Sequence, residues 1–348
     1  MSTRFCSYKM ICDKLNMPNL FFLLAVLLST GCSGSGDEDF LIEEIPVVTT
    51  PEVQTPDDGV IRFKVGTGWQ TSGKTRTDFY TDAASLESDG SFLTYAYVGS
   101  TTTAYINGST VNYTGGEWIF ADGKHYWPQT ESLNFVTYMP ASRPSYIGTP
   151  SYTVEGGPSF TCIDLPVTSG GQEGFKEYIY AYETGKTKAA NAANMSLTFR
   201  RPFANVYLRL SRAHSDLTIN SITFKNIYNN GTFVYGNSPQ WTPSGSKTDF
   251  TATIASYSNT GSSPIALGGP YLLLPQNFGG TQTIEVSATW AGWSPSTQTL
   301  STTFSTDAWT PGRSYTYTFT ISEASITVSI SDWGNDGTWT DPNETIYF

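Results

Sequence analysis

Residues Gly68 to Thr75 have the most recognisable chemical spacing in the chain, Gly-Trp-Gln-Thr-Ser-Gly-Lys-Thr. This order matches a phosphate-binding loop position by position, with Lys74 where a phosphate-contacting lysine stands. Such a loop needs a helix directly after it, because the helix N-terminal amides and dipole hold the phosphates. The residues that follow, Arg76 to Thr81, form helices poorly. We therefore expect a loop after the first strand and no nucleotide site.

Other groups that could act as bases, nucleophiles or metal ligands are few and wrongly spaced. The two histidines, His125 and His214, lie far apart in the sequence, and neither an HExxH sequence nor a nucleophile elbow is present. Residues Asp332 to Gly337 carry the oxygen ligands of a calcium loop without EF-hand spacing, which favours a turn. We expect no catalytic residues, no metal site and no cofactor, so the chain is not predicted to be an enzyme.

Aromatic side chains could instead stack on sugar rings. The chain has nine tryptophans: Trp69, Trp118, Trp127, Trp241, Trp290, Trp293, Trp309, Trp333 and Trp339. Aromatic residues this frequent in β-sandwich proteins mostly fill hydrophobic cores. Capture of glycans by exposed tryptophans on a surface lipoprotein is therefore kept as the alternative function.

The N-terminal residues have the order of a secretory signal. Basic residues precede an apolar run from Leu20 to Leu28, which is too short for a bilayer that needs roughly 20 apolar residues. Gly31-Cys32 after this run resembles the lipobox of bacterial lipoproteins, although Ser29 replaces the usual leucine. The resemblance implies a signal peptide over residues 1–31 and acylation of Cys32. Several acyl chains there would anchor the protein stably in the outer membrane.

Residues 32–58 are predicted to be a tether, because they are acidic at first and then rich in proline and threonine. An acidic tract soon after a lipidated cysteine resembles the signal that sends some lipoproteins to the cell surface. The whole chain of 348 residues is acidic, with a net charge of −11. It has no basic patch, so nucleic acid is a poor partner.

One cysteine, Cys162, remains in the folded part, because Cys6 and Cys12 leave with the leader and Cys32 is acylated. No intramolecular disulfide can then form, although the compartment would permit one. A lone cysteine is more often a small buried apolar residue than a nucleophile. We expect Cys162 to be buried in a strand.

From Ile61 onward, apolar and polar residues alternate with the two-residue period of half-buried strands. The clearest runs are Ile61-Phe63-Val65, Leu133-Phe135-Thr137, Val206-Leu208-Leu210, Ile284-Val286-Ala288-Trp290, Tyr315-Tyr317-Phe319-Ile321 and Ile326-Val328-Ile330. Asn107-Gly108, between two short apolar pairs, predicts a hairpin turn. No window has a convincing helical period, so the chain is predicted to be all-β.

Many short strands separated by Gly, Pro, Asn and Ser turns predict β-sandwiches rather than βαβ units. The chain is long enough for two domains of ordinary size. The best boundary is the Ala/Asn-rich stretch from Lys188 to Asn194. We therefore predict an N-terminal β-sandwich over residues 59–190 and a C-terminal β-sandwich over residues 191–348.

Several segments resemble the fimbrillin family of surface lipoproteins of Gram-negative anaerobes, and their order and spacing cover nearly the whole mature chain. In the N-terminal half these are Gly116-Glu117-Trp118, Tyr126-Trp127-Pro128 and Leu133 to Pro140; in the C-terminal half they are Leu197-Thr198-Phe199, Ala204-Asn205-Val206, Leu273 to Gln276 and Trp309 to Tyr317. One departure is Arg201, near where many members carry a histidine. No role is assigned to that position.

The resemblance implies two tandem transthyretin-like Greek-key β-sandwiches that assemble into fimbriae, or pili, and support cell adhesion. In stalk members a protease cuts after an arginine beyond the first strand, which releases the lipid and that strand. The vacated groove accepts a strand from the C-terminus of a neighbouring subunit, a form of β-augmentation.

Carried onto this chain, the resemblance places cleavage after Arg76, where Thr77 replaces the family's alanine. The displaced strand would carry Ile61, Phe63 and Val65, and the donor strand would carry Ile326, Val328 and Ile330. The expected partners are other fimbrillin subunits in a homo- or hetero-polymer, outer-membrane lipid through Cys32, and a host or bacterial surface ligand. The expected location is the outer membrane at the cell surface, with release into fimbriae after cleavage.

Overall fold

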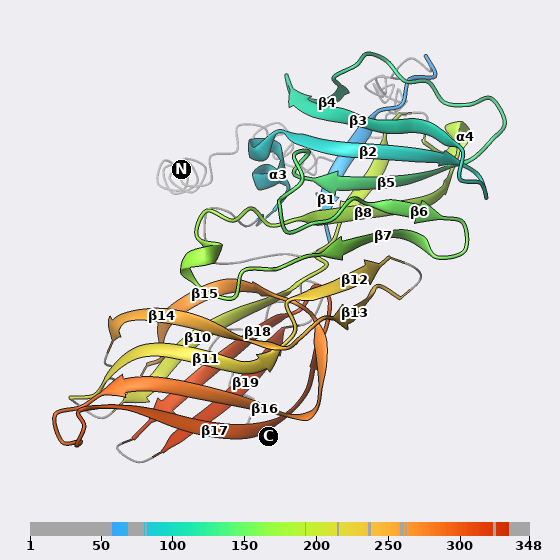
Figure 1. Ribbon diagram of the computed structural model, residues 1–348. Helices are drawn as coiled ribbons and strands as arrows, with labels where there is room; N and C mark the ends of the chain where they lie inside the picture. The colour runs from blue at the N-terminus through green and yellow to red at the C-terminus, as the bar shows by residue number, and fades with distance from the viewer. Residues whose placement is uncertain are drawn as a thin grey trace, which may run out of the picture. The chain divides into compact units, whose positions relative to one another are not determined.

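The computed structural model in Figure 1 describes residues 58–68, 80, 82–191, 193–213, 216–235, 238–257, 261, 263–322 and 325–333. For residues 256, 257 and 331–333 it describes the backbone alone. All of these residues belong to one unit of the chain, which starts at Thr55.

The described residues form an all-β fold, as predicted, with 60% strand and 6% helix. The strands are β1 (Phe63–Thr67), β2 (Ser91–Val98), β3 (Ala104–Thr114), β4 (Glu117–Phe120), β5 (Leu133–Met139), β6 (Ser151–Thr153), β7 (Gly157–Cys162), β8 (Ile179–Lys186), β9 (Met195–Phe199), β10 (Ala204–Ala213), β11 (Thr218–Ile227), β12 (Asn230–Val234), β13 (Gln240–Ser244), β14 (Thr248–Tyr257), β15 (Ile265–Leu273), β16 (Gln276–Thr289), β17 (Thr297–Trp309), β18 (Ser314–Ile321) and β19 (Ile326–Trp333). The short helices are α3 (Ala83–Asp89), α4 (Lys188–Asn191) and the 3-10 turn η1 (Gly170–Gln172).

The first sheet has the strand order β8-β5-β2-β3-β4-β1-β9. It curls until its two edge strands meet, because Tyr180 on β8 and Arg200 just after β9 exchange backbone hydrogen bonds of 3.0 and 2.7 Å. The sheet therefore encloses its own hydrophobic core, which includes the fully buried rings of Phe92, Phe135 and Phe199.

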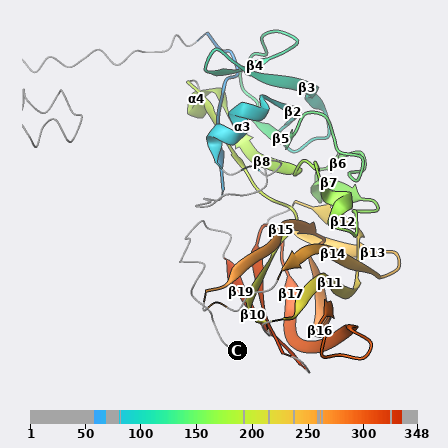
Figure 2. The same cartoon turned by 90° about the vertical axis from the view of Figure 1, so that its left-hand side faces the viewer.

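Two four-stranded sheets form a sandwich in the C-terminal half, with the orders β14-β11-β16-β17 and β15-β10-β18-β19. Figure 2 shows the two layers on either side of their shared core. Strands β10 and β18 run parallel, from Asn205 opposite Ser314 to Ala213 opposite Ile321. Val206, Leu208 and their alternate neighbours on β10 point into the core, as the two-residue period predicts.

A third hydrophobic cluster, rich in tyrosine and phenylalanine, lies around the small sheet β13-β12-β7-β6. In this sheet β7 and β12 come from different halves of the chain, and they pair from Gly231 opposite Cys162 to Val234 opposite Ser159. In addition, β9 follows the predicted domain boundary yet hydrogen-bonds within the first sheet. The division between residues 190 and 191 stays a prediction. Two backbone pairings cross it, that of β1 with β9 and that of β7 with β12.

The hairpin turn predicted at Asn107-Gly108 is wrong. Strand β3 runs straight through these residues, and the register with β2 shifts there, so that Thr94 faces Ser109 while Tyr95 faces Asn107. Gly108 has a φ of 77° and takes up the extra residue of a bulge. A bulge of this kind and a tight hairpin both place glycine in the left-handed region. The sequence Asn-Gly is therefore compatible with either structure.

The helix α3 was not predicted, because only Leu86 of its seven residues is buried and it shows no apolar stripe. Its N-terminus is a capping box in which the Ser85 amide donates to the Asp82 carboxylate (2.9 Å) and the Asp82 amide donates to the Ser85 hydroxyl (3.1 Å). Gly90 ends it in the left-handed region. Serine at the third helical position, in place of glutamate, made this signal weak.

Candidate assembly site

Strand β1 lies inside the first sheet, between β4 and β9, rather than at an edge. It runs parallel to β9 through five register pairs, from Phe63 opposite Met195 to Thr67 opposite Phe199. Its pairing with β4 is limited to Phe63 opposite Trp118. Just before the strand, the Ile61 amide donates to the carbonyl of His125 (2.8 Å). Most of the strand's backbone pairing is therefore with β9.

The side chains of this segment alternate as expected. Ile61 and Phe63 are 2% and 5% exposed, and Val65 is partly buried against the same core. The Phe63 ring lies 5.5 Å from Phe92, 5.4 Å from Phe120 and 6.0 Å from Phe135, measured between ring centroids. Phe63 is therefore the central side chain of this pocket.

The opposite side of the segment is polar. Arg62 donates two hydrogen bonds to the Asp58 carboxylate, at 2.8 and 2.7 Å. These bonds, with a further one from the Val60 amide, lower the pKa of Asp58. The pair is exposed to solvent, so its contribution to stability is small.

Both ends of the connection that follows β1 are held by neighbouring residues. The Gly68 amide donates to the Phe199 carbonyl (2.8 Å), and the Arg201 guanidinium donates to the Tyr80 carbonyl (2.5 Å). The Tyr80 hydroxyl also donates to Asp89 (2.8 Å), and burial raises the pKa of Tyr80. Residues 69–79, with Lys74 and Arg76, lie outside the described residues.

Arg201 is also one half of a buried ion pair, since its Nε donates to Glu177 Oε1 at 2.6 Å. Both side chains are buried. Burial raises the pKa of Glu177, and the neighbouring charge of Arg201 offsets part of this effect. Nothing in the sequence predicted this pair, because its partners are 24 residues apart and Glu177 is not part of an alternating run.

The predicted donor residues lie on β19, at an edge of the C-terminal sandwich. This strand is antiparallel to β18 through eight register pairs, from Ser314 opposite Trp333 to Ile321 opposite Ile326. Ile326 is buried, and Val328 and Ile330 are partly buried against the sandwich core. The three side chains therefore fill a core of their own chain.

These features have counterparts among known proteins. A family model described as fimbrillin-like matches residues 75–333. The chain belongs to the fimbrillin-like family. Comparison with curated proteins gave no match.

One solved structure shows the same fold, and a second is similar to this chain. A fimbrial protein from Bacteroides vulgatus ATCC 8482 aligns with a TM-score of 0.57 and 15% identity, covering 79% of this chain and 99% of the other. A candidate cell adhesion protein from Bacteroides uniformis ATCC 8492 aligns with a TM-score of 0.49 and 18% identity, covering 80% and 99%. At 15% identity the likeness to the Bacteroides vulgatus protein concerns the fold alone.

Membership in the fimbrillin-like family supports a fimbrial subunit that assembles with other fimbrial subunits. It also suggests a cell-surface location and points to a structural rather than an enzymatic protein. No helix in the described ranges is long and apolar enough to cross a membrane.

Cys162 of this fimbrillin-like protein is buried in β7, as expected. Burial raises the pKa of its thiol to about 12, so the thiol stays protonated near neutral pH. Cys32 and His214 lie outside the described residues. In the part of the chain that the structure covers, no group of three or more His, Cys, Asp or Glu side chains could hold a metal ion.

His125 lies in a small polar group that looks like a catalytic triad. Its Nε2 is 2.9 Å from Asp122 Oδ1, and Ser109 donates to Asp122 Oδ2 at 2.7 Å. Burial opposes ionisation of Asp122, but these two contacts outweigh it and lower its pKa. The carboxylate stands between serine and histidine, whereas a nucleophile requires the base at its own hydroxyl. The group therefore ties the β3 and β4 region together and does not activate Ser109.

The tryptophans whose side chains are described mostly serve cores. Trp118, Trp127 and Trp309 are buried, whereas Trp241, Trp290 and Trp293 are partly buried. The indole N–H of Trp309 donates to the Tyr317 hydroxyl at 2.8 Å. Trp69 and Trp339 lie outside the described residues. Among the described side chains, none offers the fully exposed indole face that sugar stacking requires.

Proposed function

We infer that this fimbrillin-like protein is a structural or accessory subunit of a fimbrium that supports cell adhesion. It has two tandem transthyretin-like Greek-key sandwiches, reaches the outer membrane as a lipoprotein acylated on Cys32, and assembles by β-strand donation. The observation that carries the proposal is the position of β1, which lies inside a sheet and is the first described strand of the chain.

Removal of β1 would open a groove between β4 and β9. The backbone of β9 would lose its five parallel register pairs, and the Phe63 site among three phenylalanine rings would be vacant. Unpaired backbone and exposed apolar surface favour the addition of another strand. A strand with apolar side chains two residues apart would fit, because the pockets alternate with the pleat.

Cleavage after Arg76 would leave β1 attached to the protein through non-covalent contacts alone. The downstream end would stay in place, because Arg201 and Asp89 hold Tyr80. The released piece would include acylated Cys32, so the same cut frees the subunit from the membrane and opens its groove.

The proposed donor carries Ile326, Val328 and Ile330, with a possible extension beyond Trp333. A donor that includes β19 must first leave β18, which breaks eight register pairs. Residues 334–348 lie outside the described part and would avoid this cost if they alone were donated. The two versions of the donor can be separated by substitution.

The test is limited trypsin digestion with intact-mass analysis, followed by light scattering. We expect cleavage after Arg76 and growth of polymers that resist boiling, with no cleavage or growth for Arg76→Ala. Val328→Asp should be cleaved without extending, whereas Thr327→Asp, on the exposed side of the same strand, should extend normally. Circular dichroism checks that both variants are folded.

Other results would change the proposal. If Val328→Asp extends and deletion of residues 334–348 blocks growth, the donor is the C-terminal segment. Cleaved protein that remains monomeric would refute the stalk role and indicate an anchor or tip subunit. A monomer that binds purified glycans would support the alternative of a glycan-binding surface lipoprotein.

A further inference from the structure

Most sheet edges in the described chain are protected against pairing with another strand. The edges of the first sheet meet each other through Tyr180 and Arg200. The edge of β14 is covered by a loop, because Ser169 donates to the Thr251 carbonyl (3.0 Å) and Thr251 donates to the Val167 carbonyl (2.9 Å). These contacts satisfy backbone groups that would otherwise be available to another chain.

Three of the remaining edges, β15, β13 and β6, are protected in other ways, whereas β19 is not. The Gln172 side chain caps β15, since it both donates to and accepts from the backbone of Leu272, at 2.9 and 3.0 Å. Strand β13 carries Pro243, which has no amide hydrogen to donate. Strand β6 has only three residues, and β19 has eight.

Strand β17 is longer than all of these edges and, like β19, lacks these protecting features. It spans thirteen residues, Thr297–Trp309, and pairs on one side with β16 at twelve positions. No described strand pairs with its other side. It contains no proline and no lysine, and Asp307 is its one charged residue. Long edge strands in soluble proteins usually carry proline or lysine or are covered by a loop. The described part of β17 has none of these features, which marks it as a pairing site.

The side chains of β17 also suit a partner. Those facing the core include Leu300 and Phe304, which are only partly buried at the margin of the sandwich. The opposite side carries exposed hydroxyls, such as Thr299, Ser301 and Thr303. An added strand would cover the apolar margin and extend the hydroxyl rows without burying a charge.

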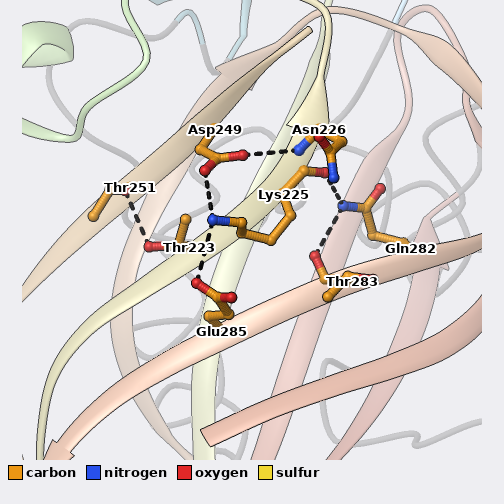
Figure 3. A network of polar contacts seen from close by, with 8 residues as sticks. All are labelled: Thr223, Lys225, Asn226, Asp249, Thr251, Gln282, Thr283 and Glu285. Atoms are coloured by element: carbon orange, nitrogen blue, oxygen red, sulfur yellow. Dashed lines mark hydrogen bonds and ion pairs between the residues drawn. The ribbon is translucent and has the colours of Figure 1, made fainter. Parts of the chain in front are cut away.

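Charges on the neighbouring strands of this sheet are matched within an ion-pair group, of which Glu285 lies opposite Ser301 of β17. Figure 3 shows Lys225 between Asp249 (2.6 Å) and Glu285 (3.3 Å), on β11, β14 and β16. Asp249 also accepts from the Asn226 amide (2.9 Å). In a chain of net charge −11, β17 is thus a nearly neutral strip on which two copies could approach.

We propose that β17 pairs with β17 of a second copy, antiparallel about a two-fold axis near Thr303. The two strands then match in length, because they are the same strand, and the contact is self-complementary. With the axis at Thr303, Asp307 faces Thr299 of the other copy, so like charges do not meet. This contact would join subunits sideways and is independent of donation into the β1 groove.

Single cysteine substitutions at positions 299, 301, 303, 305 and 307 test the pairing in membranes that carry the full chain, with Arg76→Ala included to prevent donation. Directly opposite Cα atoms lie ~4.5–5.5 Å apart, within disulfide reach. After mild oxidation, Thr303→Cys should give about tenfold more dimer than Thr283→Cys, which lies opposite Thr303 on β16 and away from the edge. Thr299→Cys alone should not cross-link, but it should do so when co-expressed with Asp307→Cys.

A single maximum along β17 supports the two-fold, and its position gives the axis. Equal cross-linking at every position, Thr283→Cys included, indicates random collision and overturns the proposal. Dimer no stronger than in the unsubstituted chain also overturns it. Cross-linking that appears only after deletion of residues 334–348 would show that the chain's own end occupies the edge, which again overturns it. Thermal melts confirm that each variant is folded.

Discussion

Replacement of Arg201 by methionine tests the role of the buried ion pair. The Arg201 guanidinium donates to Glu177 at 2.6 Å and to the Tyr80 carbonyl at 2.5 Å, and the two charged residues are 7% and 1% exposed. Arg201→Met has a similar length but no donors. It leaves the Glu177 carboxyl buried without its counter-charge, and it removes one contact that holds the chain after residues 69–79.

The loss should be large. Removal of one partner from a buried ion pair costs about 3–5 kcal/mol, because the other charge stays desolvated. A domain is typically stable by only about 5–15 kcal/mol, so Arg201→Met should lower the unfolding midpoint strongly. The double variant Arg201→Met with Glu177→Leu removes both charges and should recover most of the loss, because apolar replacement of a whole buried pair is often neutral.

The cost should also depend on pH. Burial raises the pKa of Glu177 and Arg201 offsets part of this, so removal of Arg201 raises the pKa further. A carboxyl whose pKa is raised on folding gives its full stability below its unfolded pKa of about 4.3, and loses it as the pH rises through the folded pKa. Arg201→Met should therefore be less destabilised near pH 5 than near pH 8. Glu177→Gln has no carboxyl at this position, so its loss of stability should not show this pH dependence.

The assay is guanidinium unfolding followed by tryptophan fluorescence at both pH values. Equal costs for Arg201→Met at the two pH values, together with a double variant as unstable as the single one, would refute this reasoning. The loss of stability would then come from the other contacts of Arg201, such as its hydrogen bond to the Tyr80 carbonyl, and not from the unpaired charge of Glu177.

Three further outcomes are expected. Phe63→Ala should lower the free energy of unfolding, measured by chemical denaturation, by about 3–5 kcal/mol, because it empties a site among three rings. The control Lys64→Ala, at an exposed position on the same strand, should change it by less than about 0.5 kcal/mol. Cys162 should react with a maleimide only after unfolding, since burial holds its pKa near 12; fast labelling of the native protein would contradict this. Cys32→Ala should abolish incorporation of a fatty-acid analogue and leave the melting temperature unchanged, and label that persists in the variant would rule out Cys32 as the acylated residue.

Local periodicity predicted much of the fold. The alternation of Ile61, Phe63 and Val65 predicted the buried side of the first strand, although β1 begins at Phe63 and runs to Thr67, and the surroundings of Cys162 predicted a buried thiol in a strand. These predictions succeed because one strand face packs on a core while the other faces solvent, and the sequence records this directly.

Pairing partners could not be read in the same way. The parallel pairing of β1 with β9 joins residues that are distant in sequence, such as Phe63 and Met195. No local sequence pattern predicts this pairing. The Arg201 and Glu177 pair is closer in sequence, 24 residues apart, but it too lies beyond any local pattern. Asn107-Gly108 shows the opposite problem, because one local signal is compatible with two structures and the neighbouring strand decides between them.

The geometry of the β1 site limits which strands could replace it. Backbone pairing with β9 is indifferent to side chains, so it accepts any extended segment that runs parallel to β9. The pocket of Phe63 is selective, because three phenylalanine rings surround it within 6.0 Å. In the donor triplet Ile326-Val328-Ile330, the central side chain is valine, which would leave part of that pocket empty. A void of this kind costs free energy in proportion to its volume. If β1 is displaced as proposed, the central pocket, more than the backbone groove, would determine which strand the protein accepts.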